Sequence, residues 1–273
     1  MSAPDDLTPI QSEVAAQDGA VLVLAGAGTG KTKTLTAAVV HRIRAFGVKP
    51  HRILAVTFTN KAAGEMTGRI RSALGGEGTP GWLGTFHGLA SRQLRTEPEV
   101  AGLRQGFDIL DAEDSRRLVR RILKAMNLTG DESGDLPAGR DPVKIIANRI
   151  AQLKDRLIAP EEAQAHYEWV IAEADRTGDP VDAAGLRLTA RVYADYQQRL
   201  GDANAADFGD LLLWPARTMQ RDQAYRDRWA GRFDCVLADE YQDVNHAQYI
   251  WLRLLAVEHG RIFVVGDDDQ AVF

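Results

Sequence analysis

The sequence predicts an α/β protein in which a parallel sheet, flanked by helices, is interrupted by an inserted, mostly helical domain. Strand-like apolar runs alternate with helical patterns near both ends of the chain, and this alternation is typical of a parallel sheet covered by helices. Between residues 89 and 206 the amphipathic pattern is that of helices alone. We therefore expect a discontinuous α/β domain over residues 1–88 and 207–273, and a helical domain over residues 89–206.

Local signals place the elements of the α/β domain. Apolar runs bounded by polar or glycine-rich segments predict strands at residues 21–25, 53–58, 233–238 and 261–265. Helical patterns follow three of these runs, at residues 32–45, 61–74 and 245–257. Thr59 and Asn60 are suitable N-terminal caps for the second of these helices.

The inserted domain carries clear helix start signals. Asp111 can cap a helix that runs to Met126, and a helical pattern continues over residues 189–200. Proline occupies a first helical position at Pro142 and at Pro160, which favours helix starts there. Residues 129–141 are rich in glycine and aspartate and are expected to form a loop.

The composition excludes several classes of protein. The 33 Lys and Arg against 38 Asp and Glu give a net charge of −5, which argues against coating nucleic acid by bulk charge but permits a local groove. A single cysteine, Cys235, excludes a disulfide framework or iron–sulfur cluster, and the dispersed histidines show no metal-ligand spacing. No apolar run approaches the ~20 residues of a membrane span, and no signal peptide is evident. We expect a cytoplasmic protein with no membrane contact.

The segment Ala-Gly-Ala-Gly-Thr-Gly-Lys-Thr at residues 25–32 fits the spacing of a phosphate-binding P-loop. Its glycines allow backbone N–H groups to surround phosphate oxygens, Lys31 can reach the β- and γ-phosphates, and the Thr32 hydroxyl can bind Mg²⁺. The alternative is a glycine-rich strand–helix turn followed by an incidental Lys-Thr pair. A dinucleotide-binding fingerprint does not fit, because Lys31 occupies its third glycine position.

The strand expected at residues 233–238 ends in two adjacent carboxylates, Asp239 and Glu240. Near a P-loop, Asp239 can hold Mg²⁺ and Glu240 can orient and deprotonate the attacking water. The alternative is an exposed acidic pair at the end of a strand. Cys235, inside the apolar run, is expected to be a small core residue.

Two glutamines are candidates for contacts to the nucleotide. Gln11 either forms a capping box with Thr8 at a helix start or hydrogen-bonds the adenine edge with its side-chain amide. The chemistry of the residue is compatible with both interpretations. Gln270 follows three acids after the last strand. It is interpreted either as a sensor of the γ-phosphate or as part of a solvated acidic turn. Because parallel strands end on one side of a sheet, Lys31, Glu240 and Gln270 can converge. The expected nucleotide-binding residues are Gln11, Ala25, Gly26, Ala27, Gly28, Thr29, Gly30, Lys31, Thr32 and Lys33.

Two strand–helix junctions place an aromatic residue among small hydroxyl residues. Phe58 and Phe86 suit base stacking, although filling the core is an equally good interpretation of either ring. The neighbours expected to contact phosphate or sugar of a single strand are Thr59, Asn60, Lys61, Thr85 and His87.

Seven sequence blocks, in this order, closely resemble those of the UvrD/Rep/PcrA family of superfamily 1A DNA helicases. The blocks are the Q motif at residues 7–11, motif I at 25–32, motif Ia at 57–66, Thr-Phe-His at 85–87, the DFDDLL-like segment at 207–212 with Gly209 replacing an acid, Asp-Glu-Tyr-Gln-Asp at 239–243, and the start of motif III at 266–270. The resemblance covers the whole chain.

The resemblance implies that the α/β core is the first RecA-like domain, called 1A, and that the helical insertion is domain 1B. It implies movement from 3′ to 5′ on single-stranded DNA, with ATP and Mg²⁺, and separation of duplexes, including in DNA repair. It also favours adenine recognition by Gln11 and a DNA path along Phe58, Thr85 and His87.

The sequence stops at Phe273, within motif III, before the second RecA-like domain of the family. That domain supplies arginines that stabilise charge in phosphoryl transfer. We therefore expect the N-terminal half of a motor, which binds Mg·ATP weakly and hydrolyses it poorly alone, with single-stranded DNA, strand junctions and the second domain as partners. The alternatives are a nucleotide-dependent binding module and a small-molecule kinase, but a kinase gives no reason for Gln11, Phe58 and Gln270 together.

Overall fold

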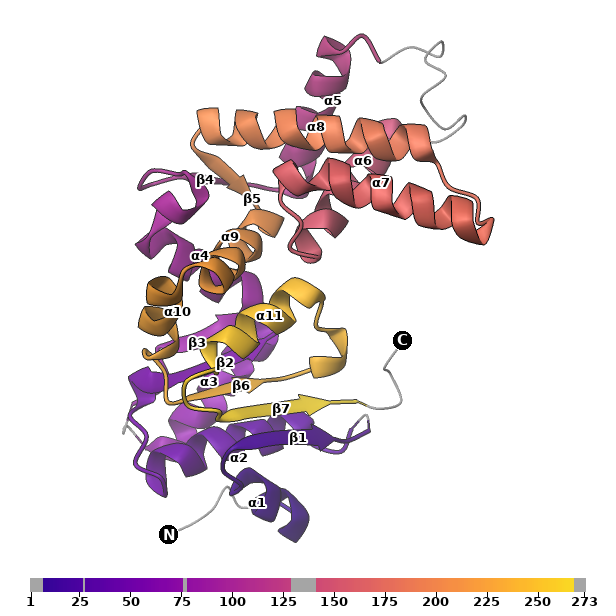
Figure 1. The fold of residues 1–273 in the computed structure, drawn as a ribbon. Helices are drawn as coiled ribbons and strands as arrows, with labels where there is room; N and C mark the ends of the chain where they lie inside the picture. Colours follow the sequence, from indigo (N-terminus) through magenta and orange to yellow (C-terminus); the bar gives the residue numbers. More distant parts are fainter. Residues whose placement is uncertain (1–6, 27, 76–77, 129–140, 268–273) are drawn as a thin grey trace. The chain divides into compact units, whose positions relative to one another are not determined.

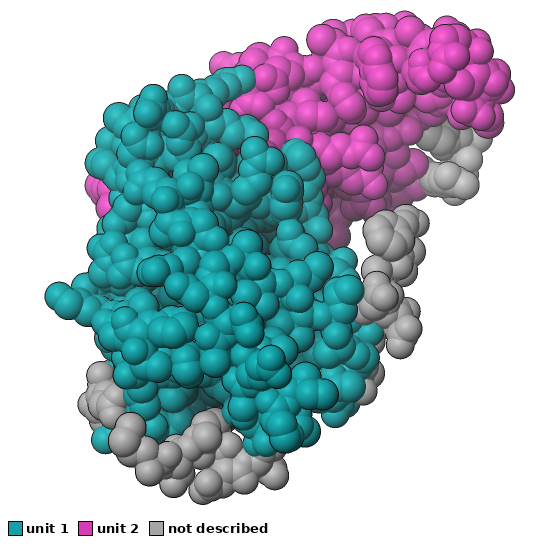
Figure 2. Space-filling model, turned by 60° about the horizontal axis from the view of Figure 1, so that its bottom comes forward, with its two compact units in different colours: residues 1–92, 218–273 teal, residues 93–217 magenta. Residues whose placement is uncertain are grey.

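The computed structural model describes residues 7–26, 28–75, 78–128 and 141–267. The chain forms two compact units, one made of residues 1–92 and 218–273 and the other of residues 93–217 (Figure 2). Both divisions fall later in the chain than the sequence-based boundaries at residues 88 and 206. Residue 88 lies inside a helix, α4 (Phe86–Thr96), and residue 206 lies inside a short strand, β5 (Ala205–Asp207).

The first unit is built on a five-stranded parallel sheet with the strand order β1-β7-β6-β2-β3 (Figure 1). Its strands are β1 (Ala20–Leu24), β2 (Ile53–Thr57), β3 (Trp82–Thr85), β6 (Cys235–Ala238) and β7 (Ile262–Gly266). The α/β fold with a parallel sheet is confirmed, and so are the four predicted strands, within one or two residues at each end. β3 is an additional edge strand. It was not predicted, because four residues are too few to show the periodicity of a strand.

Helices cover the sheet on both faces, so its central strands β2 and β6 are buried along their whole length. The helices of this unit are α1 (Pro9–Ala15), α2 (Lys31–Arg44), α3 (Asn60–Leu74), most of α4, α10 (Gln223–Ala230) and α11 (His246–Leu255), with two short 3-10 turns, η1 (Pro50–Arg52) and η3 (Tyr241–Asp243). One face packs on α2 and α3, through a cluster that includes Leu35, Val39, Met66, Ile70, Ile53, Leu237 and Phe263.

Side-chain caps fix where two of these helices begin. The Thr59 hydroxyl accepts a hydrogen bond from the Ala62 backbone N–H at 3.1 Å, which makes Thr59 the N-cap of α3 and Asn60 its first residue. Asn245 forms a capping box with Gln248 at the start of α11. Both starts agree with the sequence signals.

The second unit is mostly helical, as expected. It contains α5 (Ala112–Ala125), α6 (Pro142–Asp155), α7 (Pro160–Thr177), α8 (Ala183–Asp202), most of α9 (Phe208–Arg221) and the 3-10 turn η2 (Pro98–Ala101). The expected cap at Asp111 and the prolines at the first positions of α6 and α7 are confirmed, while α8 begins before the predicted start at residue 189. Helices alone were expected here, yet β4 (Asp108–Leu110) pairs with β5 as a small parallel sheet. Within the described ranges, no helix is both long and apolar enough to cross a bilayer.

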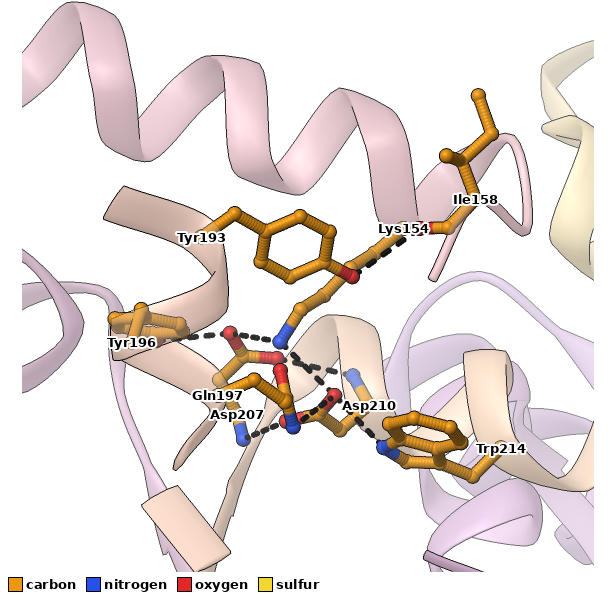
Figure 3. Close-up of polar contacts among 8 residues, drawn as sticks. All are labelled: Lys154, Ile158, Tyr193, Tyr196, Gln197, Asp207, Asp210 and Trp214. Carbon is orange, nitrogen blue, oxygen red and sulfur yellow. Dashed lines mark hydrogen bonds and ion pairs between the residues drawn. The ribbon is translucent and has the colours of Figure 1, made fainter. Parts of the chain in front are cut away.

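In the second unit, a buried ion cluster joins α6 to β5 and α9 (Figure 3). The Lys154 ammonium, fully buried on α6, lies 2.8 Å from Asp207 Oδ2 and 2.9 Å from Asp210 Oδ1. Tyr196 donates to Asp207 Oδ2 at 2.9 Å, and the Trp214 indole donates to Asp210 Oδ1 at 3.0 Å. The one ammonium faces two carboxylates, and the hydrogen bonds from Tyr196 and Trp214 help to stabilise the remaining negative charge, so every charged group of the cluster has a partner.

This cluster also accounts for the glycine in the segment at residues 207–212. A Cβ atom on Gly209 would lie 2.7 Å from Lys154 Cδ and 3.0 Å from Lys154 Cβ. The stem of Lys154 therefore occupies the space that a side chain at residue 209 needs. The acid expected from the family resemblance does not fit beside this lysine.

We expect Lys154→Met to lower the free energy of unfolding by about 3–5 kcal/mol, because it leaves Asp207 and Asp210 buried without their counter-ion. Urea denaturation followed by circular dichroism measures this change. Lys144→Met is the matched control, since Lys144 is exposed on the same helix. Equal unfolding midpoints for the two variants would contradict a structural role for the cluster.

Candidate nucleotide-binding site

The glycine-rich segment forms a turn between β1 and α2. Gly30 has a left-handed backbone, with φ of 86°, and caps the N-terminus of α2. Thr29 Oγ1 donates to the Gly26 carbonyl at 2.7 Å, and the Ala25 backbone N–H donates to the carbonyl of Gly266 at 3.0 Å. The turn therefore lies beside the carboxyl end of β7, at the start of a helix, which is the setting in which backbone N–H groups bind phosphate. Ala27 lies outside the described residues.

Lys31, the first residue of α2, lies between two carboxylates. Its Nζ is 2.9 Å from Asp267 Oδ2 and 3.5 Å from Glu240 Oε2. Burial opposes the charge of Lys31, but the hydrogen bond to Asp267 and the attraction of both carboxylates outweigh burial and raise its pKa above the ordinary value. The ammonium is thus charged at neutral pH and lies at the carboxyl edge of the sheet.

Thr32 and Asp239 supply adjacent oxygen atoms. Thr32 Oγ1 donates to Asp239 Oδ2 at 3.0 Å, and Asp239 is 2% exposed at the end of β6. Burial raises the pKa of Asp239, as does the neighbouring Glu240, while the hydrogen bond from Thr32 acts in the opposite direction. A hydroxyl and a carboxylate held this close are the hard oxygen ligands that Mg²⁺ prefers, so the donor set fits this ion.

Glu240 follows directly, in a left-handed backbone conformation with φ of 50°. Its side chain is 38% exposed, in contrast to that of Asp239. The Gln242 side-chain Nε2 donates to Glu240 Oε2 at 2.6 Å. A partly exposed carboxylate with one oxygen already bound is suited to accept a proton from a water molecule.

Sequence reasoning missed the roles of Asp267 and Gln242. Asp267 belongs to the acidic run after β7, for which a solvated turn was the alternative, yet it is 1% exposed and pairs with Lys31. Gln242 connects Glu240 to the Asp267 backbone N–H, which donates to its Oε1 at 2.9 Å. The available signals were the position of both residues after a buried strand and their place in the helicase-like blocks at residues 239–243 and 266–270, neither of which assigned them a partner. Gln270 lies outside the described residues.

Gln11 forms the capping box that was one of its two interpretations. Its Oε1 accepts from the Thr8 backbone N–H at 2.9 Å, and its backbone N–H donates to Thr8 Oγ1 at 3.2 Å. In addition, Gln11 Nε2 donates to the Thr29 carbonyl at 2.7 Å, so the side chain connects α1 to the glycine-rich turn. An amide retains a second N–H and a second lone pair beyond these bonds, and adenine recognition stays a prediction.

The junctions after β2 and β3 lie side by side, because Thr57 pairs with Thr85 in the sheet. Phe58 is partly exposed, and the centroid of its ring lies 5.3 Å from the ring centroid of Phe86. Phe86 is 1% exposed and also packs on Trp251, so it has no face to offer a base. The stacking interpretation is therefore wrong for Phe86, whose ring fills the core, and it stays a prediction for Phe58.

The polar candidates at these junctions differ in exposure. Thr59, Asn60 and Lys61 are exposed at the start of α3, where backbone N–H groups are available to a phosphate. Thr85 is partly buried, and its Oγ1 accepts from the Gly88 backbone N–H at 3.2 Å. Burial lowers the pKa of His87, so its imidazole is neutral at neutral pH.

Lys33, which was expected to bind the nucleotide, is partly buried on α2. It lines a groove between α2 and α3 together with Thr36, Glu65, Arg69 and Ser72. Its predicted contact with the nucleotide stays a prediction.

A glycine-rich turn, a lysine, a threonine and two carboxylates at the carboxyl edge of a five-stranded parallel sheet define a P-loop nucleoside triphosphatase fold of the RecA-like type. The model of the family described as UvrD/REP helicase N-terminal domain matches residues 7–273. The chain belongs to this family.

Curated relatives carry helicase names. The chain is 39% identical over 270 residues to DNA helicase II of Escherichia coli strain K12. It is 38% identical over 278 residues to ATP-dependent DNA helicase UvrD1 of Mycobacterium tuberculosis strain H37Rv, and 35% identical over 272 residues to ATP-dependent DNA helicase PcrA of Bacillus subtilis strain 168. Each match covers 98% of this chain but only 33–34% of the relative. The chain thus spans about a third of the length of these relatives.

Proposed function

We propose that this chain is the N-terminal ATP-binding part of an ATP-dependent DNA helicase that moves 3′ to 5′. In this proposal the protein binds single-stranded DNA and single/double-strand junctions, and couples ATP hydrolysis to strand translocation and unwinding. The observation that supports it most directly is the convergence of Lys31, Thr32, Asp239 and Glu240 at one edge of the sheet.

In this proposal, each of these residues has a role in ATP binding or hydrolysis. Lys31 binds the β- and γ-phosphates in place of its present carboxylate partners, because phosphate oxygens compete for the same ammonium. Thr32 and Asp239 hold Mg²⁺, which when bound neutralises charge on the phosphates. Glu240 orients a water molecule and takes its proton.

Three further contacts complete the proposed nucleotide site. The glycine-rich turn from Ala25 to Gly30 surrounds the phosphates with backbone N–H groups. Gln11 recognises the adenine edge with the part of its amide that the capping box leaves unused. Gln270 senses the γ-phosphate.

The proposed DNA path runs over the neighbouring ends of β2 and β3. An exposed helix start at Thr59, Asn60 and Lys61 suits backbone phosphates, and the partly exposed ring of Phe58 suits a stacked base. Thr85 and His87 lie at the adjacent junction and complete the same edge. Phe86 supports Phe58 from the core and does not contact DNA.

The 273-residue chain alone is expected to lack full motor activity, since it spans only about a third of the length of its helicase relatives. Steady-state ATP hydrolysis, with and without single-stranded DNA, tests the proposal in the isolated chain and in the protein as its gene encodes it. Stimulation by DNA in the complete protein is expected. Nucleotide binding without DNA-stimulated turnover would instead favour a binding module, and unwinding by the isolated chain would overturn the half-motor proposal.

We expect Phe58→Ala to weaken binding of a single-stranded oligonucleotide by about 5- to 150-fold, since a base stacked on an aromatic ring contributes ~1–3 kcal/mol. Fluorescence anisotropy measures the affinity, and a thermal melt measures the fold. Phe46→Ala is the matched control, because Phe46 is exposed after α2. A large drop in melting temperature with unchanged DNA affinity would show that Phe58, too, is a core residue.

A further inference from the structure

Gln242 lies between the two strand ends that form the proposed site. It belongs to η3, the turn that begins directly after Glu240. Both the nitrogen and the oxygen of its side-chain amide form hydrogen bonds. The Nε2 group donates to Glu240 Oε2 at 2.6 Å, and Oε1 accepts from the Asp267 backbone N–H at 2.9 Å. One amide thus connects the carboxylate that follows β6 to the main chain that follows β7.

These residues close a ring with Lys31. The Lys31 ammonium contacts Asp267 Oδ2 at 2.9 Å and Glu240 Oε2 at 3.5 Å. Both described contacts of the Glu240 carboxylate, from Lys31 and from Gln242, reach the same oxygen. Of these two contacts, the one from Gln242 does not depend on Lys31, so it can hold Oε2 after a phosphate replaces Glu240 as the partner of Lys31, and it leaves Oε1 for the water molecule.

The surrounding backbone is shaped for this contact. A Cβ atom on Gly266 would lie 3.3 Å from Gln242 Oε1 and 3.6 Å from the Gln242 backbone nitrogen. Any side chain at residue 266 would press on the amide, so glycine leaves the space that Gln242 occupies. Glu240 itself has the left-handed φ of 50°, a conformation that costs energy for a non-glycine residue.

We propose that Gln242 is a positioning residue for ATP hydrolysis, which holds the Glu240 carboxylate in its working orientation and ties that orientation to the end of β7. This inference rests on the proposed function, because it requires Glu240 to be the general base. An amide suits the task, since it can donate to a carboxylate and accept from a backbone N–H at the same time. Glutamate at this position cannot donate when ionised, and methionine offers neither strong group.

The test measures ATP turnover and nucleotide affinity in the protein as its gene encodes it. For Gln242→Met and Gln242→Glu we expect kcat to fall by about 10- to 100-fold, the loss that small misplacements of catalytic groups produce. We expect the affinity for a fluorescent ATP analogue and the KM for ATP to change by less than about threefold. Gly266→Ala is expected to lower kcat in the same direction by displacing the amide.

Gln164→Met is the matched control. Gln164 Nε2 donates to Glu168 Oε1 at 2.7 Å on the exposed surface of α7, so this variant removes the same type of amide–carboxylate bond far along the chain from η3. Its turnover is expected to equal that of the wild type. A thermal melt of every variant separates loss of the fold from loss of orientation.

Two further measurements separate positioning from a merely structural role. Adding Gln242→Met to Glu240→Gln is expected to cause no further loss of turnover, because the group to be oriented is already absent. The NMR resonances of the Gln242 side-chain amide are expected to shift in Glu240→Gln. Wild-type kcat in Gln242→Met would overturn the inference while leaving the proposed function intact, as would a full additional loss in the double variant. Absence of ATP turnover in the wild type would overturn the proposed function itself.

Discussion

Replacing Lys31 with alanine is expected to lower the affinity for ATP at least about 100-fold, to a level that equilibrium assays do not detect. The ammonium is the one side-chain cation that the described structure places in this ring, and charge-assisted bonds of this kind contribute ~1.5–3 kcal/mol each. Without it, the phosphates would face Asp267 and Glu240 directly, and this repulsion adds to the loss. Fluorescence titration with a labelled ATP analogue measures the change.

The control for this prediction addresses both charge and folding. Lys49→Ala removes an exposed lysine elsewhere in the first unit and is expected to leave nucleotide affinity unchanged. Because Lys31→Ala leaves Asp267 buried without its ammonium, the double variant with Asp267→Asn restores a neutral interior. Wild-type affinity in a folded Lys31→Ala protein would contradict the phosphate-binding role.

The parts of the site that depend on local chemistry were predictable from the sequence. The glycine-rich turn, the N-caps at Thr59 and Asp111 and the capping box at Thr8 each involve residues within a few positions of one another. The buried strands β2 and β6 were visible as apolar runs for the same reason. Because strands of a parallel sheet end on one side, the convergence of Lys31 and Glu240 followed from topology.

The features that sequence reasoning missed depend on partners that are far apart in the chain. Lys31 and Asp267 come from opposite ends of the sequence, and no local pattern distinguishes a buried aspartate from a solvated one in an acidic run. Phe58 and Phe86 occupy similar sequence contexts, yet packing against Trp251 from α11 buries only Phe86. Pairing of β4 with β5 likewise joins two segments too short to be predicted as strands.

Glu240→Gln is expected to separate ATP binding from ATP hydrolysis. The amide keeps the size of the side chain but cannot accept the proton of water, so turnover is expected to fall by about 100- to 10,000-fold, the usual contribution of a general base. Affinity for the nucleotide should persist, because Lys31 and Thr32 are unchanged and one negative charge near the phosphates is removed. DNA-stimulated phosphate release and binding of a labelled ATP analogue, measured on the same preparation of the protein as its gene encodes it, give the two quantities. Glu258→Gln, an exposed glutamate after α11, is the control and should retain both. Normal turnover in a folded Glu240→Gln protein would assign the base to another residue, and equal loss of binding and turnover would make Glu240 part of the binding surface instead.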